Sequence, residues 1–130
     1  MIPEAEIKKL VDKLDTDRII KFFRKNAINT VYFHHLAEDG DKAIEVVTDN
    51  IQDRELQIPT LVMEEDSFLL VHNNQKLSQT LAKDDFQVAS VAVNKLLDLA
   101  QSLGGVNGIA VQCSSCYFTV DLDELRDGLV

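Results

Sequence analysis

Two cysteines separated by two residues, Cys113 and Cys116, are the clearest local signal for chemistry in this sequence. A Cys-x-x-Cys pair serves thiol redox chemistry when it opens a helix, because the helix N-terminus lowers the pKa of a thiol. Here residues 117–120 (YFTV) follow, and they predict a strand. If Ser114 and Ser115 form a two-residue hairpin loop, the cysteines face each other at a Cα separation of roughly 5.5 Å, which permits a disulfide. We expect such a bridge to be strained and easily reduced.

The same pair could supply half of a zinc site, since two cysteines at this spacing can bind one metal ion. The remaining ligands would come from the three histidines, His34, His35 and His72. Neighbouring strand residues point to opposite faces, so that only one of His34 and His35 could join His72. Cys113, Cys116, His34 and His72 therefore form the alternative redox or metal set. We favour cysteines that are half-buried hairpin residues, and histidines that are ordinary sheet residues rather than general bases, with no cofactor.

Other short motifs give no reason to propose an enzyme. The acidic segments 39–41 and 64–66 could suggest calcium or magnesium, but they lack the spaced oxygen ligands of a binding loop. The glycine-rich segment 104–108 runs from helix to strand, whereas a phosphate-binding loop runs from strand to helix. No P-loop, Gly-x-Ser-x-Gly or His-Glu-x-x-His motif occurs in the chain. We predict no catalytic residues.

The charge of the chain narrows its possible partners. The 130 residues carry a net charge of −9, which argues against nucleic acid and against anionic membranes. The first 25 residues nevertheless hold seven of the 13 basic residues and have a net charge of +2, so the remainder carries −11. This segment is either a basic arm for a partner or a basic helix that packs beside its own acidic body, and we favour the second interpretation.

Charge, hydropathy and cysteine content together predict a cytoplasmic protein. Charges interrupt the first 14 residues, so they do not resemble a signal peptide. No apolar run approaches the roughly 20 residues that span a bilayer. Two cysteines without an export signal are expected to stay reduced as thiols.

The elements that must position these residues indicate one α+β domain over residues 1–130. Apolar residues at positions 7, 10, 11 and 14 predict an N-terminal helix, and Asp15 or Thr16 could cap a second helical piece that ends near Asn26. Whether these pieces form one bent helix or two stays open. Strands are expected over residues 30–36, 43–48, 60–64, 68–72, 86–89, 108–112 and 117–120, in a mixed sheet of about five to seven strands. Acidic turn residues 38–41 should join the first two strands, and residues 60–72 should form a hairpin behind Pro59.

Three further helices complete this expectation. Asn73 or Asn74 could cap a short helix through Leu81. Ser90 could cap a helix that Gly104 ends in the left-handed conformation. The unit 86–112 should then be a right-handed β-α-β crossover that makes its two strands parallel. A hairpin and a short helix from Asp121 or Asp123 close the chain.

With the elements in this order, the chain resembles the enhanced serine sensitivity protein family, specifically the N-terminal SseB-like domain. The likeness covers roughly residues 19–126. A helix leads directly into an aromatic strand (IIKFFRKNAINTVYF), FLLVHNN precedes the short helix QKLSQTL, and FQVASVAVNKLLDLA, GIAVQ and YFTVDLDEL follow in order. The resemblance implies a small bacterial cytoplasmic α+β domain with a non-enzymatic role and no established catalytic residues.

Aromatic pairs supply the predicted partner surface. In a strand, one member of the pair Tyr32 and Phe33, and one of Tyr117 and Phe118, should point away from the first core. Helices could cover both faces of the sheet, which we favour, or an apolar patch could remain exposed as an interaction site. We therefore expect a protein-interaction or regulatory module whose candidate surface lies near these four residues, with another protein or a second copy as partner. The thiol-redox or zinc protein is the alternative.

Overall fold

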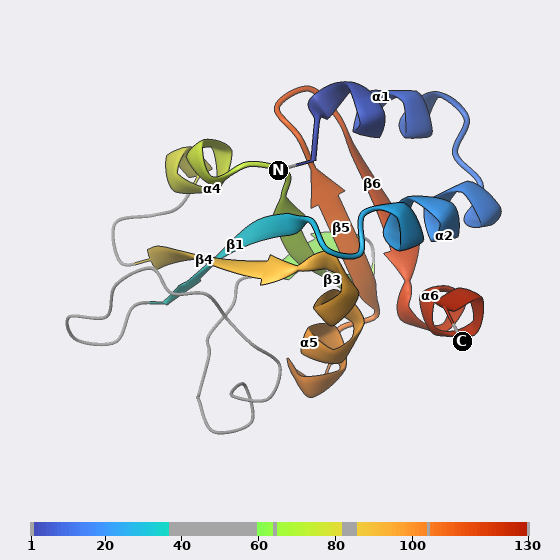
Figure 1. The fold of residues 1–130 in the computed structure, drawn as a ribbon. Helices are drawn as coiled ribbons and strands as arrows, with labels where there is room; N and C mark the ends of the chain where they lie inside the picture. Colours follow the sequence, from blue (N-terminus) through green and yellow to red (C-terminus); the bar gives the residue numbers. More distant parts are fainter. Residues whose placement is uncertain (1, 37–59, 64, 82–85, 104, 130) are drawn as a thin grey trace.

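The computed structural model describes residues 2–36, 60–63, 65–81, 86–103 and 105–129. These residues form a six-stranded mixed sheet with helices on both faces (Figure 1). The strands are β1 (Thr30–Leu36), β2 (Thr60–Met63), β3 (Asp66–His72), β4 (Phe86–Ala92), β5 (Gly108–Gln112) and β6 (Tyr117–Asp121). The helices are α1 (Glu4–Asp12), α2 (Thr16–Lys25), α4 (Gln75–Leu81), the short 3₁₀ helix η1 (Val93–Lys95), α5 (Leu96–Leu103) and α6 (Leu122–Leu129). The predicted α+β class is confirmed.

The strand order is β4-β1-β3-β5-β6, with β2 paired to β3. The β3–β5 pair is parallel and the other pairs are antiparallel. Since β4 is antiparallel to β1 and β1 is antiparallel to β3, β4 runs parallel to β5 with two strands between them. The unit 86–112 is thus a crossover between parallel strands, as predicted, and residues 60–72 form the predicted hairpin.

The two faces of the sheet are covered by different helices. One face packs against α1, α2, α5 and α6, and its buried strand residues are Val31, Phe33, Leu69, Val71, Ala89, Val91, Ile109, Val111, Phe118 and Val120. On the other face α4 packs over β1, β3 and β4. Phe68, His72, Val88 and Ala110 are buried on that face. The favoured prediction, that helices cover both faces, is therefore confirmed in the described part of the chain.

The N-terminal segment forms two helices rather than one bent helix. Asp15 has an extended backbone, and its carboxylate accepts a hydrogen bond from the Arg18 backbone N–H at 2.8 Å, which caps α2 as predicted. Asn26 ends α2. Leu14 does not continue the apolar stripe of α1, as its periodicity suggested, because α1 ends two residues earlier and leaves Leu14 47% exposed.

Two predicted boundaries in the C-terminal half are wrong or lie outside the described residues. Ser90 does not cap a helix: it lies inside β4 and pairs with Tyr32, because β4 continues along the whole of β1. The helical region starts at Val93, after Ala92, without a side-chain cap. Gly105 takes the left-handed conformation, with φ of 69°, whereas Gly104 is outside the described residues.

Three predictions for the N-terminal half also fall outside the described residues. They are the turn 38–41, the strand 43–48 and the position of Pro59 before a strand.

Candidate functional site

The four aromatic residues of the predicted partner surface do not lie together on one face. Phe33 and Phe118 are buried in the core, at 0% and 2% exposure, so the prediction that they contact a partner is corrected. Phe118 packs edge-to-face on Phe22 of α2, with ring centroids 5.4 Å apart. Tyr32 is half-buried and Tyr117 is 48% exposed. Strand alternation places one member of each pair on each face, as expected, but the aromatic surface that remains is small.

His72, the histidine whose side chain the structure describes, is not brought to the cysteines. His72 is fully buried beneath α4, where its Nδ1 lies 3.1 Å from the Ser78 hydroxyl. Because His72 pairs with Gln112, and Cys113 is the next residue of the chain, the side chains of His72 and Cys113 lie on opposite faces of the sheet. The side chain of His34 is outside the described part of the structure. No group of three metal-ligating side chains occurs among the described residues, so the proposed zinc set is not assembled there.

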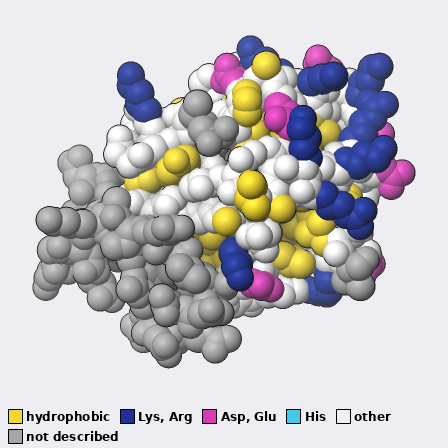
Figure 2. All heavy atoms as spheres, in the orientation of Figure 1, with side chains coloured by type: hydrophobic (Ala, Val, Ile, Leu, Met, Phe, Trp, Pro, Cys, Tyr) yellow, Lys and Arg dark blue, Asp and Glu magenta, His cyan; other side chains and the backbone are white. Residues whose placement is uncertain are grey.

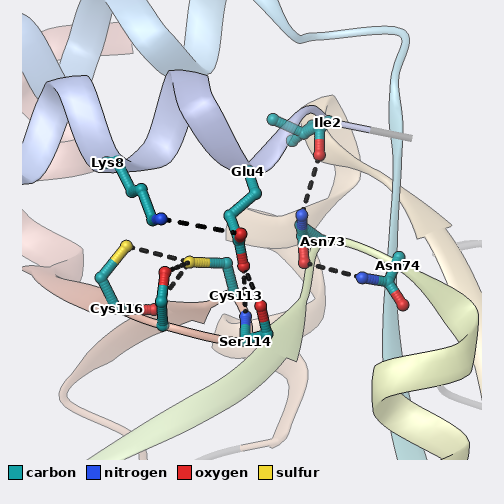
Figure 3. A network of polar contacts seen from close by, with 9 residues as sticks. Ile2, Glu4, Lys8, Asn73, Asn74, Cys113, Ser114 and Cys116 are labelled. Atoms are coloured by element: carbon teal, nitrogen blue, oxygen red, sulfur yellow. Dashed lines mark hydrogen bonds and ion pairs between the residues drawn. The ribbon is translucent and has the colours of Figure 1, made fainter.

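Cys113 and Cys116 lie at the tip of the β5–β6 hairpin (Figure 3). The backbone N–H of Cys113 donates to the Cys116 carbonyl at 2.8 Å, so that Ser114 and Ser115 form the loop, as the sequence predicted. Both cysteines are free thiols, and their Sγ atoms are 2.9 Å apart. The segment after the pair is a strand, so the pair does not open a helix as a thioredoxin-type site does.

The hairpin tip also forms hydrogen bonds with the first turn of α1. One carboxylate oxygen of Glu4 accepts a hydrogen bond from the backbone N–H of Ser114 at 2.9 Å and a second from the Ser114 hydroxyl. The other carboxylate oxygen faces Lys8 at 3.9 Å. The Ser114 hydroxyl, its backbone N–H and Lys8 together lower the pKa of Glu4, against a smaller opposing effect of burial. Glu4 is therefore ionised throughout the neutral range.

The environment of Cys116 disfavours its thiolate. Burial, followed by the hydrogen bond and the charge interaction with Cys113, raises the pKa of Cys116 from 9.0 to about 11. Because the thiolate is the nucleophile and the metal ligand, a thiol that stays protonated at neutral pH reacts slowly. This geometry can close a disulfide, but it does not activate an attacking sulfur.

A cleft of about 580 Å³ lies between α1 and α2. It is lined by Glu6, Lys9, Leu10, Asp12 and Lys13 from the first helix and the turn, and by Arg18, Lys21, Phe22 and Lys25 from the second helix. Figure 2 shows basic side chains gathered on the side of the molecule where Figure 1 draws these two helices. Five basic and two acidic side chains give the cleft a formal charge of +3, against −9 for the whole chain.

Three of these cations have no acidic partner among the residues that the structure describes. Lys25 pairs with Glu6 at 3.5 Å and Arg18 pairs with Asp15 at 3.3 Å. Lys9, Lys13 and Lys21 are exposed and form no ion pair with a described residue. The cleft therefore presents three lysines that pair with no described carboxylate, alongside the carboxylate of Asp12, and its net charge stays positive.

The packing of the basic segment agrees with the interpretation that we favoured for it. The helix α2 packs beside α6, and Lys21 and Arg24 lie around one hollow with Glu124 and Asp127 of that helix. Arg24, however, donates to the Gly128 carbonyl at 2.6 Å rather than to an acidic side chain of α6. Every described ion pair of residues 1–25 has its carboxylate within the same segment. Within the described part of the chain, no acid outside residues 1–25 forms an ion pair with a cation of the cleft.

Glu6 and Asn26 fix the geometry of the cleft. Asn26 is 2% exposed, and its side-chain amide donates to Glu6 at 2.9 Å and to the Phe22 carbonyl at 3.0 Å. Glu6 thereby ties α1 to the end of α2 while it also pairs with Lys25. The two walls are linked by this partly buried polar contact, so the cleft is formed in advance of any ligand.

Sequence patterns did not reveal the roles of Glu4, Ser114, Glu6 and Asn26, since each role depends on a contact between distant residues. The excess of basic residues before position 26 was the available signal for the cleft. Comparisons of the chain with protein-family models, with curated proteins and with solved structures found no significant match. None of the described helices has the length and apolar character needed to cross a membrane.

Proposed function

We propose that this protein is a non-enzymatic binding module that holds an acidic segment of a partner protein in the cleft between α1 and α2. The observation that carries the proposal is a group of three lysines without an ion pair to a described residue, Lys9, Lys13 and Lys21, around a cleft of net positive charge in an acidic protein. Concave sites of roughly 300–1,000 Å³ are typical of ligand binding, and a cleft lined by one sign of charge attracts the opposite sign.

Charge complementarity favours a short acidic protein segment over larger polyanions. Nucleic acid and anionic membranes extend far beyond a cleft of about 580 Å³ and would meet the acidic remainder of the surface. Their affinity for proteins depends on many lysine and arginine contacts, which this chain offers only locally. A short segment can place its carboxylates at the three lysines and avoid that repulsion.

The cleft also has an apolar part. Leu10 and Phe22 line it between the charged side chains of the two helices. Apolar anchors in a pocket carry much of the energy of a protein interface, and surrounding charges contribute orientation and association rate. The preferred segment therefore has an apolar side chain flanked by glutamate or aspartate.

Fluorescence anisotropy with a labelled peptide of alternating glutamate and leucine tests this proposal. Saturable binding is expected for this peptide and not for a matched peptide of lysine and leucine. The double variant Lys9→Glu with Lys21→Glu reverses one charge on each wall and should weaken binding at least tenfold, which corresponds to about 1.4 kcal/mol.

Lys76→Glu with Lys95→Glu is the matched control, because it makes the same change in net charge. Lys76 lies on α4 and Lys95 on η1, and neither lines the cleft. The control variant should bind the glutamate–leucine peptide within about twofold of the wild type, as expected for charges outside the interface. Equal weakening by both double variants would contradict the assignment to the cleft, because net charge alone would then explain binding.

A homodimer is the second form that such an interaction can take, because the rest of the chain carries a net charge of −11. Light scattering without peptide distinguishes the homodimer. A dimer that dissociates in the Lys9→Glu and Lys21→Glu double variant would identify a second copy as the partner.

Membership in the SseB-like family stays a prediction from the order of the elements. We also propose a cytoplasmic location, a reducing compartment that suits two free thiols.

A further inference from the structure

We propose that Cys113 and Cys116 are a modification site, at which a low-molecular-weight disulfide converts the thiol pair to a reversible intramolecular disulfide without unfolding the protein. The Sγ atoms are already 2.9 Å apart. A disulfide bond is 2.03–2.05 Å long, so the sulfur atoms must approach by only about 0.9 Å. This inference is independent of the cleft and of its proposed partner.

The hairpin fixes both side chains in this arrangement. Gln112 and Tyr117 are paired in the ladder, and the backbone hydrogen bond from Cys113 to Cys116 closes the turn after them. The Cys113 thiol points at its partner residue, with Sγ also 3.1 Å from the Cys116 carbonyl oxygen. Formation of the bond therefore requires side-chain rotation rather than a change of strand register.

The two sulfurs differ in their access to solvent, which sets the order of the reaction. Cys113 is 1% exposed, whereas Cys116 is half-buried. An oxidant that itself contains a disulfide bond therefore meets Cys116 first. A minor thiolate population at Cys116 attacks one sulfur of the oxidant, which forms a mixed disulfide and releases one small thiolate that takes up a proton.

The second step closes the bridge. Cys113 loses its proton to solvent, and its sulfur attacks Sγ of Cys116 and expels the second small thiol. The two cysteine thiols thus lose two hydrogen atoms in total, and the disulfide bond of the oxidant gains them as two thiols. Because burial keeps Cys116 protonated at neutral pH, the exchange is slow there and becomes faster as the pH rises.

The disulfide would affect α1 through Ser114, the first of the two residues between the cysteines. The backbone N–H and the hydroxyl of Ser114 both donate to Glu4, in the first turn of α1. Loss of the Cys113 thiol proton and rotation of both side chains change the surroundings of the Ser114 amide. That amide is a local reporter of the reaction in the folded protein.

Oxidation of the folded protein with oxidised glutathione at mildly alkaline pH tests the proposal. The chain has only two cysteines, so a thiol titration after denaturation reads the pair alone. We expect free thiols to fall from two to none per chain, the mass to fall by two hydrogen atoms, and the protein to keep its folded circular dichroism spectrum. The Ser114 amide signal should shift, and a dithiol reductant should restore both thiols and the original spectrum.

Cys116→Ser is the principal control, because Cys116 is the less buried of the pair. This variant should either keep its one free thiol or gain one glutathione. The mass of the chain without glutathione should show no loss of hydrogen. Cys113→Ser is the second control, and the mass measurement on the wild type decides the proposal even if this buried substitution prevents folding. Persistent free thiols, a stable glutathione adduct on the wild type, a bridge between chains, or a bridge that forms only with loss of the folded spectrum would each overturn the proposal.

Discussion

At the scale of single residues, strand alternation decides which aromatic side chains can meet a partner. Phe118 lies against Phe22 in the core, whereas its neighbour Tyr117 is 48% exposed. Phe118→Ala should lower the free energy of unfolding by about 3–5 kcal/mol, the usual cost of removing a buried phenylalanine. Tyr117→Ala should change it by about 0.5 kcal/mol or less. Urea denaturation measures both, and a comparable loss in the two variants would contradict the assignment of the faces.

Glu4 makes a pH-dependent contribution to stability. Hydrogen bonds from Ser114 lower the pKa of Glu4 in the folded state below its ordinary value of 4.5. A lowered pKa means that the contribution is fully present above pH 4.5 and is lost as the pH falls through the folded-state value. Glu4→Gln should therefore destabilise the protein at neutral pH, and the difference from wild type should shrink in acid.

Denaturation of both proteins at neutral and at strongly acidic pH tests this expectation. A matched substitution of an exposed acid outside this contact, Glu124→Gln, should show no such convergence. A difference between wild type and Glu4→Gln that stays constant with pH would mean that the ionised carboxylate does not hold the hairpin tip.

The contact between Glu4 and Ser114 also illustrates what residue patterns could not reveal. The sequence predicted the two-residue loop at Ser114 and Ser115, because strand alternation on each side limits where the turn can lie. It could not predict the acceptor for the Ser114 donors, which is 110 residues away along the chain. The same limit applies to His72, whose alternation predicts a face of the sheet but not the helix that buries it.

At the scale of elements, the cap at Asp15 positions α2 and therefore one wall of the cleft. Its carboxylate satisfies the Arg18 backbone N–H at the helix start. Asp15→Ala should cost about 1 kcal/mol, the typical effect of removing such a cap, whereas Asp15→Ser retains an oxygen acceptor and should cost less. Thermal denaturation compares the two, and equal losses would show that the cap does not stabilise this helix.

The elements were predictable where local chemistry determines them. Asp15, Asn26 and the paired cysteines mark boundaries that the structure keeps. The prediction of a helix start at Ser90 was wrong, because a serine before an apolar helical pattern suits an N-cap, yet pairing with β1 extends β4 beyond this residue. Long-range pairing of this kind is invisible to a local pattern, and it moved the helix start to Val93.

At the scale of the whole molecule, the separation of charge is the property that connects fold and function. The chain turns back between α1 and α2 and brings basic side chains from both helices to one cleft, while the net charge is −9. The composition of the first 25 residues predicted a basic segment. It could not predict that the segment folds on itself, because the angle between two helices depends on tertiary packing, here including the contact from Asn26 to Glu6.

Binding governed by this separation should depend strongly on salt. Screening shortens the range of a charge from about 10 Å at 0.1 M salt to about 3 Å at 1 M. The dissociation constant for the glutamate–leucine peptide should therefore rise at least tenfold across that range. Anisotropy titrations at both salt concentrations measure it, and an unchanged constant would show that the lysines do not attract the ligand.

The most direct test of binding at the basic cleft is a map of backbone amide shifts by nuclear magnetic resonance during titration with the glutamate–leucine peptide. We predict saturable shifts that are largest along α1 and α2, at Lys9, Lys13 and Lys21, and small on the sheet around Tyr32 and Tyr117. Shifts centred on those tyrosines, or no saturable shifts at all, would contradict the account.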